Sequence, residues 1–126
     1  MTLIRIGGVR LNANIAITEQ AHCQGLKHIE ALTIMAFPYK TLEIRSFWME
    51  DTISPLDIIF CNAGKIVSIE NGEPLSLKYL GNVKTDLVIE VPAGFCERTN
   101  IKVGDCVKME KSIAVIAAEY AQSLKI

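Results

Sequence analysis

Apolar and polar residues alternate along several short stretches of the chain, a pattern typical of β-strands with one buried face. The alternation, and the turn residues between the stretches, predict strands over residues 11–17, 42–49, 86–91 and 106–109. Because the connections are short and few stretches show a helical period, we expect a mostly β domain.

The central part of the chain carries the clearest hairpin signal. Two apolar, β-branched runs, 56–61 and 65–70, are separated by Asn62-Ala63-Gly64, a short turn that contains glycine. Before this hairpin, an apolar run over residues 32–37 stops at Pro38, where we expect it to end. After it, the pattern of residues 75–82 is ambiguous.

Helical signals are short except near the C-terminus. Thr18 as N-cap and Gly25 as terminator predict a short helix over residues 19–23. Pro92 at the entrance and Asn100 at the exit predict another over residues 93–99. From Ser112 onward, apolar residues recur on one helical face, and this stripe consists of Ile113, Ile116, Ala117, Tyr120, Ala121 and Leu124.

These elements predict a small antiparallel β-barrel or sandwich with one or two short helices and a C-terminal helix. We divide the chain into an N-terminal extension (1–10), a β-barrel-like domain (11–109) and a C-terminal amphipathic helix (110–126). A helix this short is marginal alone, so its stripe needs an acceptor surface, either a patch on the barrel or a second subunit. We favour the subunit, and the predicted oligomer contacts are then Ile113, Ile116, Tyr120 and Leu124.

Composition and charge limit the possible partners. Half of the 126 residues are hydrophobic, which suffices for one core. The chain has 13 basic and 14 acidic residues, so its formal net charge is −1. Without a basic block, we expect no nucleic-acid partner. No apolar stretch approaches the ~20 residues of a membrane helix, and Arg5 and Arg10 interrupt the region where a signal peptide would be apolar. We therefore expect no membrane partner and no signal peptide, and a cytoplasmic protein, or a virion component if it belongs to a phage particle.

The four cysteines, Cys23, Cys61, Cys96 and Cys106, form no C-x-x-C pair. In a cytosolic chain of this apolar content we predict free thiols, since buried cysteine behaves as a small apolar residue. His22 and His28 flank Cys23 but lie six positions apart, whereas metal ligands on one helix face are three or four apart. We predict no metal and no cofactor, because phosphate-loop and dinucleotide motifs are also absent from the sequence.

Residues 46–60 read SFWMEDTISPLDIIF. This segment resembles the signature of domain of unknown function family 192 (uncharacterised protein family 0127), which runs S-F-W-M-K-N-T-x-x-P-L-D-I-x-F. Flanking pieces agree in order and spacing, and the resemblance covers about residues 11–109. The matching flanking pieces are Gln24-Gly25-Leu26, Met35 and Phe37, Gly64 to Val67, Val91 to Phe95, and Val103-Gly104-Asp105.

The resemblance implies a compact β-barrel-like fold and no particular activity. The chain departs from the family pattern at Glu50 and Asp51, where the family usually has Lys and Asn, so this loop is acidic instead of basic. Lys27 also stands where the family has Met in its R-G-L-M turn.

Candidate chemistry centres on the same segment. A ligand site would use Trp48 and Met49 as an apolar platform, with Asp51 and Asp57 holding polar groups. In the structural interpretation, which we favour, Trp48 plugs the barrel and Asp57 braces the loop by accepting backbone N–H bonds. Paired carboxylates for acid–base chemistry would have to come from Glu50, Asp51, Asp57, Glu70 and Glu73, none of which the sequence places face to face.

Two hypotheses of function follow. The first is a non-enzymatic structural or interaction module that forms a homo-oligomer, as a component of an assembly such as a phage particle. It rests on the near-neutral charge and on a sequence without a recognisable catalytic motif. The second is a small-ligand-binding or hydrolytic domain with its site around Trp48, Asp51 and Asp57. We favour the first and assign no catalytic residue.

Overall fold

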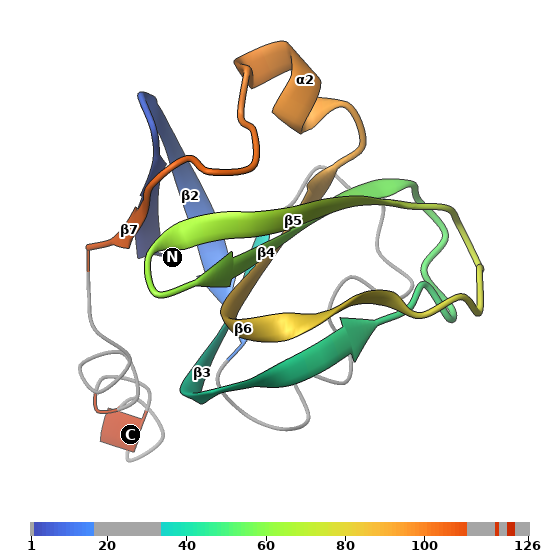
Figure 1. The fold of residues 1–126 in the computed structure, drawn as a ribbon, viewed down its shortest axis with the longest axis horizontal. Coiled ribbons are helices and arrows are strands. Elements are labelled where there is room, and N and C mark those ends of the chain that lie inside the picture. The colour runs from blue at the N-terminus through green and yellow to red at the C-terminus, as the bar shows by residue number, and fades with distance from the viewer. Residues whose placement is uncertain (1, 17–33, 111–117, 119–120, 123–126) are drawn as a thin grey trace.

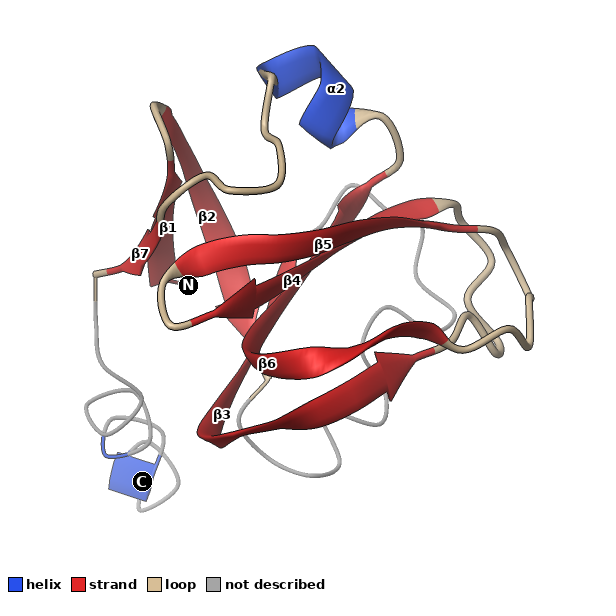
Figure 2. Ribbon diagram, viewed as in Figure 1, coloured by secondary structure: helices blue, strands red, loops and turns tan. Residues whose placement is uncertain are grey.

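Seven strands form one mixed sheet in the computed structural model, which describes residues 2–16, 34–110, 118 and 121–122 (Figure 1). The sheet order is β5-β4-β6-β3-β2-β1-β7, and one short helix follows β6 (Figure 2). The elements are β1 (Thr2–Ile6), β2 (Val9–Ile15), β3 (Met35–Phe47), β4 (Leu56–Asn62), β5 (Lys65–Gly72), β6 (Leu80–Pro92), α2 (Phe95–Thr99) and β7 (Val107–Met109). The mostly β class is confirmed.

The first strand lies where the sequence analysis expects only an extension. Residues 2–6 form β1, which pairs antiparallel with β2 through a turn at Gly7-Gly8 and also pairs with β7. Ile4 and Ile6 are buried while Arg5 between them is exposed. The strand alternation is therefore present, but the buried face of β1 has only two apolar residues, Ile4 and Ile6, beside Thr2.

Two features of β3 differ from the predictions. It pairs parallel with β2, through Asn14 opposite Met35, so the sheet is mixed and not antiparallel throughout. A parallel pair needs a long connection, and the chain from residue 16 to residue 34 supplies one. Pro38 does not end the strand: β3 continues through it, and a register shift between Pro38 and Glu43 accommodates a residue that has no N–H to donate.

The predicted central hairpin is confirmed as β4 and β5. Ala63 and Gly64 both have positive φ, 48° and 82°, as a two-residue turn that matches the twist of the flanking strands requires. Strand β4 lies between β5 and β6 and is buried along nearly all its length. Because both of its faces are covered, its sequence reads as a continuous apolar run and not as an alternation.

Two clusters of buried side chains lie on the two faces of β4 and β6. Along β4, Ile59 and Cys61 join one cluster, while Ile58 and Phe60 join the other. The first cluster also holds Ile4, Ile6, Leu11, Ala13, Ala36, Ile66, Leu87, Ile89, Val91, Cys96, Ile101 and Val107. The second holds Ala16, Phe37, Met49, Leu56, Leu80 and Val88.

The two edge strands of the sheet approach one another. Lys65 on β5 forms a single bridge with Cys106, just before β7, and Val107 N–H donates to the Gly64 carbonyl at 2.8 Å. The strand order itself ends at β5 and β7, so the sheet curls without a continuous ladder between its edges.

Helix α2 confirms the end of the helix predicted over residues 93–99, but it starts two residues later, at Phe95. Gly94 caps its start with φ of 86°, and Asn100 ends it in the left-handed conformation with φ of 59°. Cys96 and Ile101 anchor this part of the chain in the first cluster. The predicted helix over 19–23 lies outside the described residues, as does most of the predicted C-terminal helix. No helix in the described ranges is long and apolar enough to cross a membrane.

Candidate functional site

Two loops form one end of the sheet, at the right of Figure 1. We call residues 48–55, between β3 and β4, and residues 73–79, between β5 and β6, the two-loop tip. Backbone hydrogen bonds join the loops: Met49 N–H donates to Ser76 O at 3.1 Å, and Leu75 N–H donates to Thr52 O at 2.9 Å. The tip is therefore a hydrogen-bonded unit and not two independent loops.

The two-loop tip exposes large apolar side chains. Four of them are between 50% and 66% exposed: Ile53, Leu75, Leu77 and Tyr79. The ring of Tyr79 stacks on half-buried Trp48, with centroids 5.3 Å apart and planes 6° from parallel. Single exposed apolar residues are ordinary, whereas several on two joined loops make the tip a candidate site.

The backbone of the tip is strained at two positions. Asp51 and Leu75 have φ of 59° and 62°, a region in which residues with a Cβ are disfavoured by about 1–2 kcal/mol. At Leu75 this conformation accompanies the N–H bond to Thr52 O. Such strain persists where the surrounding structure fixes the backbone, and it gathers at functional surfaces.

Charge at the tip is predominantly acidic. Glu50, Asp51 and Glu73 carry three negative charges against the one positive charge of Lys78, so the tip has a formal net charge of −2. None of these four side chains forms an ion pair with another described residue. A partner bound to the apolar group therefore meets a negative rim.

Asp57 lies at the start of β4, under helix α2. Its Oδ2 accepts the N–H of Gly94 and the N–H of Cys96, each at 3.1 Å. The side chain is 5% exposed, so it satisfies two donors at the helix start that water reaches poorly. This arrangement agrees with the predicted bracing role of Asp57.

A cavity of about 540 Å³ opens beside Asp57. It lies between α2, the first residues of β4 and the last residues of β5. Apolar side chains form most of its wall, including Leu56, Ile69 and Ile101. Asp57, Glu73, Glu97 and Lys102 are its charged lining residues.

The structure separates the residues that the sequence analysis grouped. Trp48, Met49 and Asp51 lie in the two-loop tip, whereas Asp57 lines the cavity, which the other three do not line. The prediction that Trp48 plugs the interior is wrong: Met49 is fully buried, and Trp48 stacks near the surface. Met49, two positions after Phe47, shares the second cluster with it, whereas Trp48 lies between them and is not a member of that cluster.

The sequence analysis missed the second loop of the tip. The only indication of this loop in the sequence is that Leu75, Leu77 and Tyr79 alternate with polar residues. The same pattern equally fits a strand with a buried face. Of the candidate carboxylates, Glu70 accepts the N–H of Gly81 at 2.8 Å, and only Asp57 and Glu73 share a cavity.

His22, Cys23 and His28, which the sequence analysis considered and rejected as metal ligands, lie outside the described residues. Within those residues, no group of three potential ligands gathers around one point. The predicted oligomer contacts Ile113, Ile116, Tyr120 and Leu124 also fall outside the described ranges.

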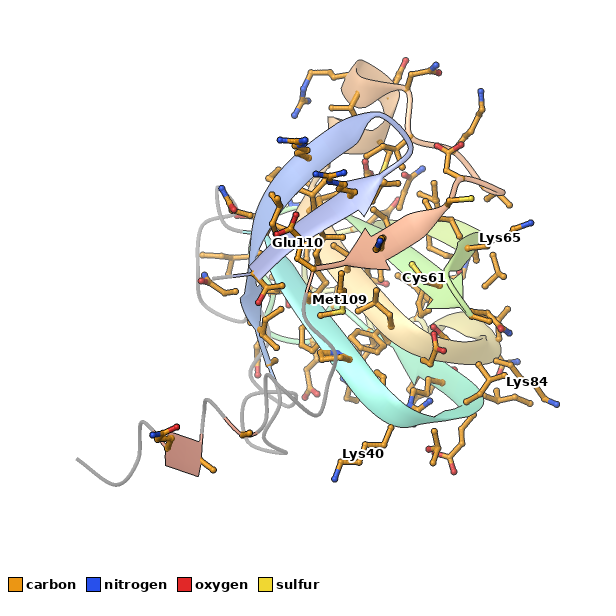
Figure 3. The ribbon with its side chains drawn as sticks, turned by 90° about the vertical axis from the view of Figure 1, so that its left-hand side faces the viewer. Lys40, Cys61, Lys65, Lys84, Met109 and Glu110 are labelled. Atoms are coloured by element: carbon orange, nitrogen blue, oxygen red, sulfur yellow. The ribbon has the colours of Figure 1, made fainter. Side chains whose placement is uncertain are left out.

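Two buried thiols have raised pKa values. Burial raises the pKa of Cys61 to about 12, with a further contribution from the negative charge of Asp86. Burial also raises the pKa of Cys96 to about 12, helped by the charge of Asp57 and by a hydrogen bond to it. In Figure 3 Cys61 lies inside the fold, whereas Lys40, Lys65 and Lys84 point outward.

We expect iodoacetamide at pH 8 to alkylate Cys106 much faster than Cys61 or Cys96 in the native protein. Cys106 is exposed, whereas a thiol with a pKa near 12 is thiolate in only about one molecule in ten thousand at this pH. Peptide mass spectrometry over time measures the three rates, and urea should equalise them. Equal native rates would contradict the burial of Cys61 and Cys96.

Comparison with known proteins gives a family and a fold. The model of family DUF192, described as Uncharacterized ACR, matches residues 2–109. A crystal structure of a protein of unknown function from Novosphingobium aromaticivorans DSM 12444 is 27% identical, with a TM-score of 0.76, over 84% of this chain and 83% of that one. A crystal structure of a proposed transcription regulator from Sinorhizobium meliloti 1021 is 24% identical, with a TM-score of 0.79, over 86% of this chain and 92% of that one. At this identity the similarity shows the fold alone. No curated protein matches the chain.

Proposed function

The chain belongs to the DUF192 family, whose description names no activity, so we propose a function from its geometry: a structural module that joins copies of itself into an assembly. The observation that carries this proposal is the exposed apolar group of the two-loop tip. A particle built from many copies, such as a phage particle, is one assembly that this arrangement could build.

The energetics of the tip favour a partner. Removing one large apolar side chain from water stabilises a complex by about 1.5–3 kcal/mol before entropic costs. The tip exposes four such side chains on loops that are already held together, so little backbone order has to be gained on binding. A rigid apolar surface of this kind is suited to a protein partner.

We infer that the occupant is the tail of a second copy, residues 111–126. This tail carries the predicted apolar stripe, which needs an acceptor surface. Ala121, a member of the stripe, is exposed in the single chain, so the chain leaves that position uncovered. The side chains of the tail, two lysines and one glutamate, carry a net charge of +1, opposite in sign to the side chains of the tip at −2.

A contact between tip and tail can form once, head to tail, or twice around a twofold axis in a reciprocal dimer. The alternative is a pair in which tip meets tip. That arrangement would place two acidic rims, each with Glu50, Asp51 and Glu73, against one another, and like charges at an interface are unfavourable. The charges therefore favour tip to tail.

Sedimentation of matched variants tests the proposal. Leu77→Ser in the tip and Tyr120→Ser in the tail should each weaken self-association about ten- to a hundredfold, because each removes an apolar side chain from the contact. Leu42→Ser is the control, because Leu42 is 46% exposed on β3, outside the tip. We expect the unmodified chain and the control to share one oligomeric state and the two test variants to shift toward monomer.

Two results would overturn the proposal. One is an unmodified chain that stays monomeric at high concentration. The other is an oligomer that Leu77→Ser and Tyr120→Ser leave intact. Because Leu77 is 65% exposed, Leu77→Ser should fold normally, and its circular dichroism and free energy of unfolding verify this.

A further inference from the structure

The cavity beside α2 borders the two-loop tip, with which it shares Pro55, Glu73 and Pro74, but its chemistry points to a function other than self-association. At about 540 Å³ it is within the size range of small-molecule sites. It lies between elements that the core holds in place: Leu56, Cys96 and Ile101 are all buried. The cavity is thus a formed space and not a gap between mobile loops.

Negative charge predominates in the cavity. The lining includes three acidic residues, Asp57, Glu73 and Glu97, and one basic residue, Lys102, so its formal net charge is −2. None of these three carboxylates forms an ion pair with another described residue. An anionic ligand would therefore be repelled by this lining.

Asp57 is the carboxylate that a ligand would meet deepest in the protein. Both of its backbone hydrogen bonds go to Oδ2, and the Cys96 thiol also forms a hydrogen bond with this carboxylate. The carboxylate is nine-tenths or more buried, beside the apolar wall of Leu56 and Ile101. In such surroundings a cation gains more from a carboxylate than it does in water.

We propose that this cavity binds a small organic cation, a protonated amine carried on an apolar body. The ammonium group would lie toward Asp57 and Glu97, and its N–H donors would satisfy carboxylate oxygens. The apolar body would pack against Leu56, Ile69 and Ile101. Apolar walls with a few convergent polar groups are the usual composition of small-molecule sites.

The test compares two probes that have nearly the same shape and differ in charge. Cyclohexylmethylamine is protonated at pH 7, whereas cyclohexylmethanol is neutral. In titrations followed by amide NMR, we expect the amine to shift the N–H signals of Gly94, Cys96 and Val103. The alcohol should bind at least tenfold more weakly.

Variants assign the binding to the cavity. Glu97→Gln removes an exposed negative charge and should weaken amine binding several-fold, without affecting the fold. Glu110→Gln is the control, since Glu110 is exposed and lies outside the cavity, and it should bind the amine as the unmodified chain does. Asp57→Asn keeps an acceptor for the N–H bonds and should weaken amine binding further.

Three results would overturn this proposal: equal affinity for amine and alcohol, shifts confined to residues away from the cavity, or no binding of the amine at millimolar concentration. The outcome is separate from that of the self-association proposal. Leu77→Ser lies in the two-loop tip and should bind the amine as well as the unmodified chain does.

Discussion

Gly81→Ala should lower the free energy of unfolding by about 3–5 kcal/mol, the largest effect that we expect from any single methyl group in this chain. Gly81 has φ of 90°, and a Cβ there would lie 2.4 Å from the ring of Phe60. That ring is fully buried and packs edge-on to Phe47, with centroids 5.9 Å apart, so it has little room to move. The loss of stability therefore includes both the backbone strain at Gly81 and the overpacking against Phe60.

Gly104→Ala separates the two causes. Gly104 has φ of 96° but open space around its Cβ position, so its substitution should cost only the strain, about 1–2 kcal/mol. Gly8→Ala, with open space and no positive φ, should cost still less. Urea denaturation measures all three variants. Equal losses for Gly81→Ala and Gly104→Ala would contradict the packing of Phe60 against β6.

Asp57→Ala should lower the free energy of unfolding by about 2–4 kcal/mol. It removes the acceptor of two backbone N–H groups, those of Gly94 and Cys96, and a poorly hydrated donor left without a partner costs about 1–3 kcal/mol. The loss should be concentrated at α2, so hydrogen exchange at Cys96 N–H should accelerate more than at the central strand β4.

Asp57→Asn is the matched comparison for this prediction. Its amide oxygen can accept the same two bonds, although more weakly than a carboxylate, so we expect a smaller loss of stability than for Asp57→Ala. If Asp57→Ala unfolded at the same urea concentration as the unmodified chain, the bracing role of Asp57 would be wrong.

The parts of the fold that the sequence predicts well are those set by local chemistry. The turn at Asn62-Ala63-Gly64 and the two runs beside it define the β4–β5 hairpin without reference to the rest of the chain. Asn100 ends α2 as predicted, because it adopts the left-handed conformation, whereas Pro92 ends β6 and the helix starts after Gly94.

Other elements depend on contacts that no local pattern records. The strand β1 has few apolar positions, and it is stabilised by pairing with β2 and with β7, which is a hundred residues away. The parallel direction of β3 is set by its neighbours β2 and β6. Pro38 remains in a strand, opposite Leu87 of β6, and the register of the pairing shifts directly after it.

In the candidate sites, too, the sequence predicts what a local motif sets and misses what depends on contacts in space. The motif at residues 46–60 singles out Trp48 and Asp57, but only the fold shows that one lies in the two-loop tip and the other in the cavity. The pattern around Leu77 and Tyr79 is ambiguous in the sequence, and the exposure of these side chains depends on what lies next to them in space. The cavity joins side chains from four separate segments, so no spacing in the sequence predicts it.

A mixing experiment tests the central claim, that tip and tail of different copies bind one another, most directly. One variant carries Leu77→Ser and keeps its tail; the other lacks residues 111–126 and keeps its tip. The sheet is complete by Met109, so the truncated chain should fold. By native mass spectrometry, each variant alone should be monomeric. When the two variants are mixed in equal amounts, they should form a one-to-one heterodimer and nothing larger, because only one intact tip and one intact tail remain. A mixture that stays monomeric, or a truncated chain that associates with itself, would contradict the account.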